Sequence, residues 1–212
     1  VLDALGTALA SAGTGLRWIG YLSTTGVYGD HKGGWVDEDT QPAPGNARSR
    51  ARLAAEQRWL ALGRVADIPV HIFRLGGIYG PGRGPFGAIR EGTARSVVKP
   101  GQVFGRIHVE DIARVLEASM QAPRAGRVYN VVDDEPAPAE DVRAHAAGLI
   151  GLPPPPEVAY EDEAPRMSEM AKSFYAESRR VRNTRIRQEL GVTLAYPSYR
   201  EGLAAILAAE QG

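Results

Sequence analysis

Short apolar segments alternate with amphipathic segments along this chain of 212 residues, and this alternation constrains the fold more than any other feature. Three apolar runs, at residues 16–23 (LRWIGYLS), 69–75 (PVHIFRL) and 128–132 (VYNVV), are rich in strand-forming residues. Such continuous runs are typical of parallel strands that are buried on both faces. Between them, residues 47–62 and 109–120 carry apolar side chains at helical spacing. The sequence therefore predicts an α/β fold with a parallel sheet.

Further helices are predicted at residues 1–15, 139–150, 165–175, 183–190 and 198–209. Gly63 is expected to end the helix that begins at Ala47, and His108 is expected to cap the helix that follows it. Residues 76–87 hold six glycines and two prolines, so we expect no regular structure there. The arginine-rich segment 179–187 is expected to form a solvated helix face rather than a phosphate site.

Composition excludes several functional classes. The 25 basic and 25 acidic residues balance, which argues against a protein that binds nucleic acid or an anionic membrane by bulk charge. There is no cysteine, so disulfides, thiol nucleophiles and cysteine-ligated metals are excluded. No metal is predicted, because no two of the four histidines show metal-ligand spacing on one helix. No segment approaches the ~18 apolar residues of a membrane span. We expect a cytoplasmic protein that acts on a small molecule.

The most specific motif is the segment 22–30 (LSTTGVYGD), in which a buried strand ends in hydroxyl side chains. Parallel strands deliver their C-terminal residues to the ligand crevice of an open α/β sheet. There, Ser23 or Thr24 can hydrogen-bond a substrate oxygen while a proton moves. Taken alone, the motif favours a local turn in which Thr24 and Thr25 bond the backbone.

Other segments follow this motif in a fixed order. They are an acidic loop at residues 35–40 (WVDEDT), then residues 73–83 (FRLGGIYGPGR), 106–113 (RIHVEDIA) and the run at 128–132. Together they resemble the extended short-chain dehydrogenase/reductase family, which comprises NAD(P)-dependent epimerases and dehydratases. The resemblance runs over nearly the whole chain. It implies a Rossmann-like doubly wound parallel sheet, of which this sequence represents mainly the C-terminal half.

The resemblance also implies a domain arrangement. Residues 1–79 and 108–133 would form the nucleotide-binding core, residues 80–107 and 134–197 a small substrate-facing lobe, and residues 198–212 a C-terminal helix. The family's N-terminal half, with its glycine-rich pyrophosphate turn, is not in this sequence. On the order of 80 residues would therefore precede Val1, since each βαβ unit takes about 30 residues. The family further implies a homodimer formed through two long helices.

NAD or NADP is the cofactor that the resemblance implies. The side chains or backbone expected to contact it belong to Ser23, Thr24, Arg74, Gly76, Gly77, Ile78 and Tyr79. The glycines among them would let the backbone approach the nicotinamide closely. The competing interpretation of residues 76–79 is a tight turn that binds no ligand.

The family's catalytic Tyr-x-x-x-Lys pair is absent. With Ala55-Glu56 as the anchor its two positions fall at Arg48 and Arg52, whereas the Ser49-Arg50 pair as anchor gives Asn46 and Arg50. Neither alignment supplies a phenol. An arginine keeps the positive charge, but it stays protonated and cannot exchange a proton near neutrality.

A different residue would have to supply the proton. We predict Thr24, Tyr28 and Arg52 as the catalytic residues, with Tyr79 and His108 as weaker candidates for the proton donor. For Tyr28, Tyr79 and His108, packing or helix capping is the stronger interpretation.

The sequence thus predicts an NAD(P)-binding oxidoreductase or epimerase for a small polar or sugar-nucleotide-like substrate. The alternative is a non-catalytic dinucleotide-binding redox sensor or scaffold, which the missing Tyr/Lys pair favours. A third interpretation is a structural subunit that binds no nucleotide.

Overall fold

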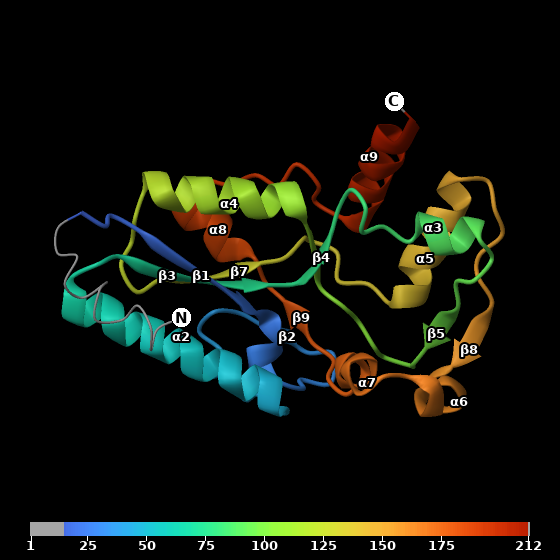
Figure 1. Ribbon diagram of the computed structural model, residues 1–212, viewed down its shortest axis with the longest axis horizontal. Helices are drawn as coiled ribbons and strands as arrows, with labels where there is room; N and C mark the ends of the chain where they lie inside the picture. Colours follow the sequence, from blue (N-terminus) through green and yellow to red (C-terminus); the bar gives the residue numbers. More distant parts are fainter. Residues whose placement is uncertain (1–14, 212) are drawn as a thin grey trace.

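The computed structural model describes residues 15–211, so all of the predicted N-terminal helix except Gly15 lies outside the described residues. At its centre is a parallel sheet of three strands in the order β1-β3-β7. The strands are β1 (Ile19–Thr24), β3 (Val70–Leu75) and β7 (Val128–Val131). Figure 1 shows them side by side near the middle of the molecule. The predicted α/β fold with a parallel sheet is confirmed.

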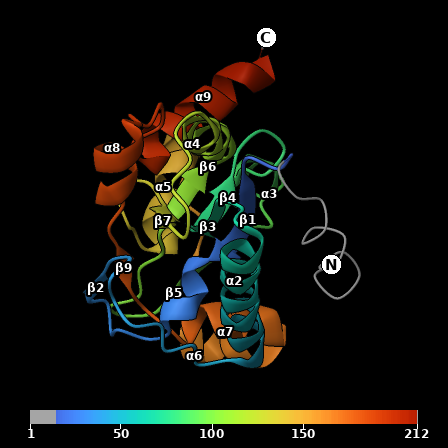
Figure 2. The same cartoon turned by 90° about the vertical axis from the view of Figure 1, so that its left-hand side faces the viewer.

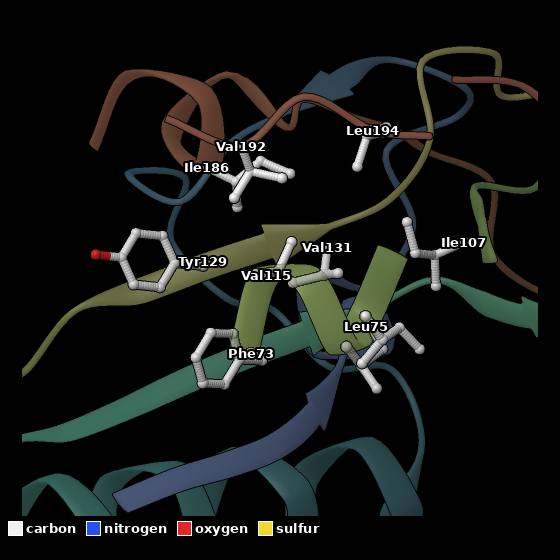
Figure 3. Packing of buried hydrophobic residues seen from close by; sticks show 10 residues of the cluster. Phe73, Leu75, Ile107, Val115, Tyr129, Val131, Ile186, Val192 and Leu194 are labelled. Carbon is white, nitrogen blue, oxygen red and sulfur yellow. The ribbon is translucent and has the colours of Figure 1, made fainter. Parts of the chain in front are cut away.

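Helices cover both faces of this sheet (Figures 1 and 2). Helix α2 (Ala47–Ala66) lies along one face, and α4 (Val109–Gln121) and α8 (Thr184–Leu190) lie on the other. The main core fills the space between the strands and this second pair of helices, as Figure 3 shows. Phe73 of β3 and Val131 of β7 meet Val115 and Ile186 there, and all four are less than 1% exposed.

Shorter elements complete the fold. Three further parallel pairs join β2 (Trp35–Val36) to β9 (Arg180–Val181), β4 (Gly77–Tyr79) to β6 (Arg106–His108), and β5 (Ser96–Val98) to β8 (Glu157–Ala159). The remaining α-helices are α3 (Phe86–Arg90), α5 (Ala139–Leu149), α6 (Tyr160–Glu163), α7 (Glu169–Tyr175) and α9 (Tyr199–Gln211). Two 3₁₀ turns lie at η1 (Thr25–Tyr28) and η2 (Ala164–Arg166). None of the helices within residues 15–211 is long and apolar enough to cross a membrane.

The glycine-rich segment after β3 is more regular than we predicted. The expectation of no regular structure over residues 76–87 is wrong, because β4 forms at Gly77–Tyr79 and α3 begins at Phe86. The strand owes its hydrogen bonds to β6, which pairs Gly77 with Arg106. A partner so distant in sequence leaves no local signal.

Gly63 has a different role from the predicted helix end. Helix α2 runs on to Ala66 and is capped by Asp67 in the left-handed conformation, at φ 51°. A Cβ atom at Gly63 would lie 2.6 Å from Cγ2 of Val70 and 2.8 Å from the carbonyl oxygen of Ile68. The glycine therefore allows α2 to pack closely against the chain that enters β3.

Two other local expectations have opposite outcomes. His108 caps α4 as predicted, because its Nδ1 accepts a hydrogen bond from the Glu110 backbone N–H at 3.3 Å. The prediction that residues 179–187 form one solvated helix face is wrong. Part of that segment forms β9, Arg179 lies 2.9 Å from a Glu177 carboxylate oxygen, and Arg185 lies 2.7 Å from Asp39. Residues 165–175 likewise form η2 and the separate helix α7 rather than one helix.

Candidate active site

A cavity of about 720 Å³ lies where β1 and β3 end. Its walls come from the end of β1, the first turns of α2, strands β4 and β6, and the segment 173–181. Parallel strands place their C-terminal ends at one edge of the sheet, so segments far apart in sequence meet there. The topology thus explains why the hydroxyl motif and the glycine-rich segment share this cavity.

Ser23 lines the cavity and anchors its wall to the interior. Its Oγ donates a hydrogen bond of 2.5 Å to Oε1 of Glu56 on α2. The same carboxylate accepts from Arg74 of β3, whose Nη2 lies 2.8 Å from Oε2. Arg74 is therefore held in a buried ion pair and does not line the cavity, although we predicted that it contacts the cofactor.

Thr24 ends β1 and caps the following 3₁₀ turn. Its Oγ1 accepts a hydrogen bond of 3.1 Å from the backbone N–H of Gly26. Thr24 also lines the cavity. This is the local turn that the sequence alone favoured. Because Oγ1 acts here as an acceptor, its own hydrogen remains available to a ligand. The local and the ligand-binding interpretations are thus compatible.

Tyr28 lies behind the cavity rather than on it. Its side chain is fully buried, and its hydroxyl donates to Oδ1 of Asn130 at 2.8 Å. The Arg74 guanidinium lies 4.9 Å from the centre of the ring. Burial is the main cause that raises the pKa of the Tyr28 hydroxyl. This position gives no support to the predicted catalytic role of Tyr28.

Arg48 and Arg52, the two positions that the Ala55-Glu56 anchor assigns to the family's Tyr/Lys pair, both line the cavity, whereas of the alternative pair Asn46 and Arg50 only Asn46 does. Arg52 donates from Nη1 to the Tyr21 hydroxyl at 3.1 Å and to the Leu22 carbonyl oxygen at 3.2 Å. These bonds fix its guanidinium beside the end of β1. Arg48, one turn earlier, is exposed and forms neither an ion pair nor a hydrogen bond with the described residues.

A second part of the cavity wall, formed by residues 76–78, is mostly backbone. Gly76, Gly77 and Ile78 line the cavity, and a Cβ atom at Gly76 would lie 3.0 Å from both the Gly105 carbonyl oxygen and a Val132 methyl group. The glycines therefore keep the chain close to β6 and leave a bare strip of backbone facing the cavity.

Tyr79 connects this wall to the end of the chain. Its hydroxyl donates to the Ser198 carbonyl oxygen at 3.2 Å, and burial is the main cause that raises its pKa well above the ordinary value. Gly202 of α9 lies directly against the ring, since a Cβ atom there would be 2.2 Å from the Tyr79 hydroxyl oxygen. The geometry favours packing over proton transfer for this tyrosine.

His108 also serves structure. It is 1% exposed and does not line the cavity, and burial is the main cause that lowers its pKa. Within residues 15–211, no group of three or more His, Asp or Glu side chains is placed to hold a metal ion.

Sequence reasoning missed several residues of the cavity wall. Arg83 and Arg106 lie on it, and so do Phe174, Glu177 and Arg179 from the segment 173–181. Arg106 stands in a motif that we assigned only to the start of α4, and nothing else in its neighbourhood in the sequence points to the cavity. The segment 173–181 is remote in sequence: Arg179 lies 150 residues after Gly29, to whose carbonyl oxygen it donates a hydrogen bond. The arginine-rich run that begins at Arg179 was the available signal, and we had assigned it to a solvated helix face.

These features define an open α/β sheet with a cavity at its carboxyl edge. Comparison with known proteins identifies the family. The model of the NAD dependent epimerase/dehydratase family matches residues 4–132, and the chain belongs to this family. It is 31% identical over 183 residues to a 3-diazoavenalumate denitrifying reductase from Streptomyces sp, across 79% of this chain. The chain spans 58% of the length of that reductase.

Solved structures agree with this family and with a Rossmann-like fold. A conserved protein of unknown function from Silicibacter pomeroyi is 56% identical, with a TM-score of 0.92 over 100% of this chain and 73% of that one. MoeE5 in complex with UDP-glucose and NAD is 25% identical, with a TM-score of 0.80 over 98% of this chain and 68% of that one. The human epimerase family protein SDR39U1, solved with NADPH, has the same fold at 19% identity, with a TM-score of 0.77 over 98% of this chain and 73% of that one. Structural relatives thus bind NAD or NADPH.

The residues present fit the nicotinamide end of such a cofactor. The bare backbone at Gly76 and Gly77 leaves room for a flat ring, and the Arg52 guanidinium can donate hydrogen bonds to its amide or ribose oxygens. The Thr24 hydroxyl has one hydrogen, which can go either to that amide or to a substrate oxygen. Ser23 contributes less, because its hydroxyl hydrogen is directed to Glu56.

Proposed function

We propose that this chain forms the substrate side of an NAD(P)-dependent oxidoreductase or epimerase that acts on a small polar or sugar-nucleotide-like molecule. One observation carries the proposal: Thr24, Arg52 and the Gly76–Gly77 backbone converge on a single cavity at the carboxyl edge of the sheet. The Streptomyces relative is named a reductase, which is consistent with hydride transfer.

Each residue has a defined task in this proposal. A bound nicotinamide would supply or accept the hydride. The Thr24 hydroxyl donates to a substrate oxygen, and Arg52, fixed by Tyr21 and Leu22, stabilises negative charge that develops on that oxygen. Since a guanidinium stays protonated, Arg52 contributes charge rather than a proton. The proton that the reduced oxygen takes up would come from solvent water, and in the reverse direction the substrate hydroxyl would release it there.

A second candidate is a dinucleotide-binding sensor or scaffold without turnover. The observation that favours it is that Arg48 and Arg52, which one alignment sets against the family's tyrosine and lysine, both line the cavity. Neither Tyr28 nor Tyr79 replaces that tyrosine, because Tyr28 is turned away from the cavity and the Tyr79 hydroxyl is bound to Ser198.

Titration of the complete natural protein with NADH and NADPH tests both candidates. We expect saturable quenching or enhancement of the reduced nicotinamide fluorescence. A panel of aldehydes, ketones and sugar nucleotides then tests for oxidation of the bound cofactor. Turnover with any member supports the enzyme and excludes the scaffold, whereas tight binding with no turnover favours the scaffold. Unchanged fluorescence at millimolar cofactor would overturn both.

A further inference from the structure

A second, smaller cavity of about 230 Å³ lies beside the main one. Tyr79, Arg83, Arg106 and Ala139 line both, so the two spaces adjoin along a shared wall. The rest of the smaller cavity is formed by Val142 and Arg143 of α5, by Tyr199 and Leu203 of α9, and by Pro85.

Three arginines and no carboxylate line this smaller cavity. Arg106 bonds only to neutral acceptors, since its Nη1 donates to the carbonyl oxygens of Phe104 and Ala137, each at 2.9 Å. Nη1 of Arg143 is buried and has no hydrogen-bond partner among the described residues. Arg83 is exposed at the rim and forms no ion pair with them. None of the three guanidinium groups therefore forms an ion pair within residues 15–211.

The acidic side chains nearby are engaged elsewhere or buried. Asp134 pairs with Arg187, and Glu135 lies 3.1 Å from Arg200. Asp133 is 2% exposed, and neither of its carboxylate oxygens has a hydrogen-bond partner in the described chain. Burial raises the pKa of Asp133 to about 8, so it carries little charge at neutral pH. Glu140 and Asp141, on the first turn of α5, are not part of the cavity wall.

The remaining walls are apolar or aromatic. Val142, Leu203 and Pro85 offer aliphatic surface, and the rings of Tyr79 and Tyr199 add aromatic surface. A guanidinium fork binds the two oxygens of a carboxylate or phosphate side by side, and desolvated walls strengthen that attraction. The cavity therefore combines recognition of an anion with space for a small apolar body.

We propose that this smaller cavity binds an oxyanion group of the substrate, a carboxylate or a phosphate carried on a small apolar body. Arg143 and Arg83 supply the binding charges, and Arg106 fixes the shared wall. The rest of the substrate then extends along that wall into the main cavity toward Thr24. This orientation rests on the proposed function, whereas the binding of the anion does not.

Isothermal titration of the cofactor-free protein with benzoate and with inorganic phosphate tests the proposal. The variants are Arg143→Gln and Arg83→Gln, and the control is Arg64→Gln, an exposed arginine near the far end of α2. We expect the native protein and the control to bind at least one anion, with a dissociation constant about tenfold higher or more in Arg143→Gln. Benzoate bound more tightly than phosphate assigns the site to carboxylates, and the reverse order assigns it to phosphates.

Two results would overturn the proposal. One is that neither anion binds the native protein at millimolar concentration, and the other is that both variants bind as the native protein does. If Arg143→Gln fails to fold, as judged by circular dichroism, Arg83→Gln decides, because Arg83 is exposed on a loop. No cofactor is present in this experiment, so its failure is distinguishable from failure of the proposed function, which is read from nicotinamide fluorescence.

Discussion

The hydroxyl oxygen of Ser23 and Oε1 of Glu56 lie 2.5 Å apart inside the molecule, and this contact joins the cavity wall to a buried ion pair. Glu56 is the centre of the arrangement, because the same carboxylate binds Arg74 at 2.8 Å. The side chains of Arg74 and Glu56 are 6% and 2% exposed, so neither charge is hydrated.

Glu56→Gln should destabilise the protein strongly. The substitution keeps the shape of the side chain but leaves the charge of Arg74 buried without a counter-ion, which costs about 3 to 5 kcal/mol. Denaturant unfolding measures the change in the free energy of unfolding. Glu117→Gln, at an exposed position on α4, is the control and should change it little. Equal stability of the two variants would contradict the role assigned to Glu56.

Thr24→Ala should weaken cofactor binding or slow hydride transfer by about tenfold, the effect of one lost hydrogen bond. Thr24→Ser keeps the hydroxyl and should restore most of the loss, whereas a steric effect would not be restored in this way. Fluorescence titration and stopped-flow kinetics are the measurements. If Thr24→Ala matched the native protein in both, Thr24 would have no part in the site.

Asp133 should make stability fall as the pH rises. Its pKa is about 8 in the folded protein against an ordinary value of 3.8, so the folded state holds a proton that the unfolded state releases. The stabilising effect is complete below pH ~4 and is lost as the pH rises through the folded pKa, at up to ~1.4 kcal/mol per pH unit. Asp133→Asn should remove this slope. Urea unfolding of both proteins from pH 5 to pH 9 (~one-unit steps) compares the slopes, and parallel curves would show that Asp133 does not titrate there.

Two glycine substitutions in helices should have opposite signs. Gly63→Ala forces a Cβ atom to within 2.6 Å of Val70, and such overpacking costs about 1 to 3 kcal/mol, more than the helix propensity gained. Gly148→Ala, in α5, meets nothing within 4 Å and should stabilise by about 0.5 to 1 kcal/mol. Thermal unfolding of the two variants checks the pair. A gain in stability for Gly63→Ala would contradict the close packing of α2 described above.

The sequence identified the segments that form the cavity better than the direction of each side chain. Ser23, Thr24, Arg52 and residues 76–79, all predicted to belong to a site, line it. Arg74 and Tyr28 come from the same motifs but turn inward, to Glu56 and Asn130. A motif fixes where the backbone runs, whereas the inward turn depends on partners that lie on other elements.

Long-range pairing accounts for most of what the sequence did not reveal. The central strands were predicted because each is a continuous apolar run. Strands of two or three residues, such as β4 and β9, form only because β6 and β2 supply their hydrogen bonds. Arg179 and Glu177 reach the cavity by the same route, since β9 draws their segment to β2.

The contact between Gly202 and the Tyr79 ring couples helix α9 to a residue of the cavity wall. Tyr79 lines both cavities, while its hydroxyl donates a hydrogen bond to the carbonyl oxygen of Ser198, just before α9. A ligand that shifts this ring must either carry α9 with it or break the bond to Ser198. The rate of amide hydrogen exchange in α9 would therefore change when a ligand occupies either cavity, although α9 itself need carry no label at the binding site.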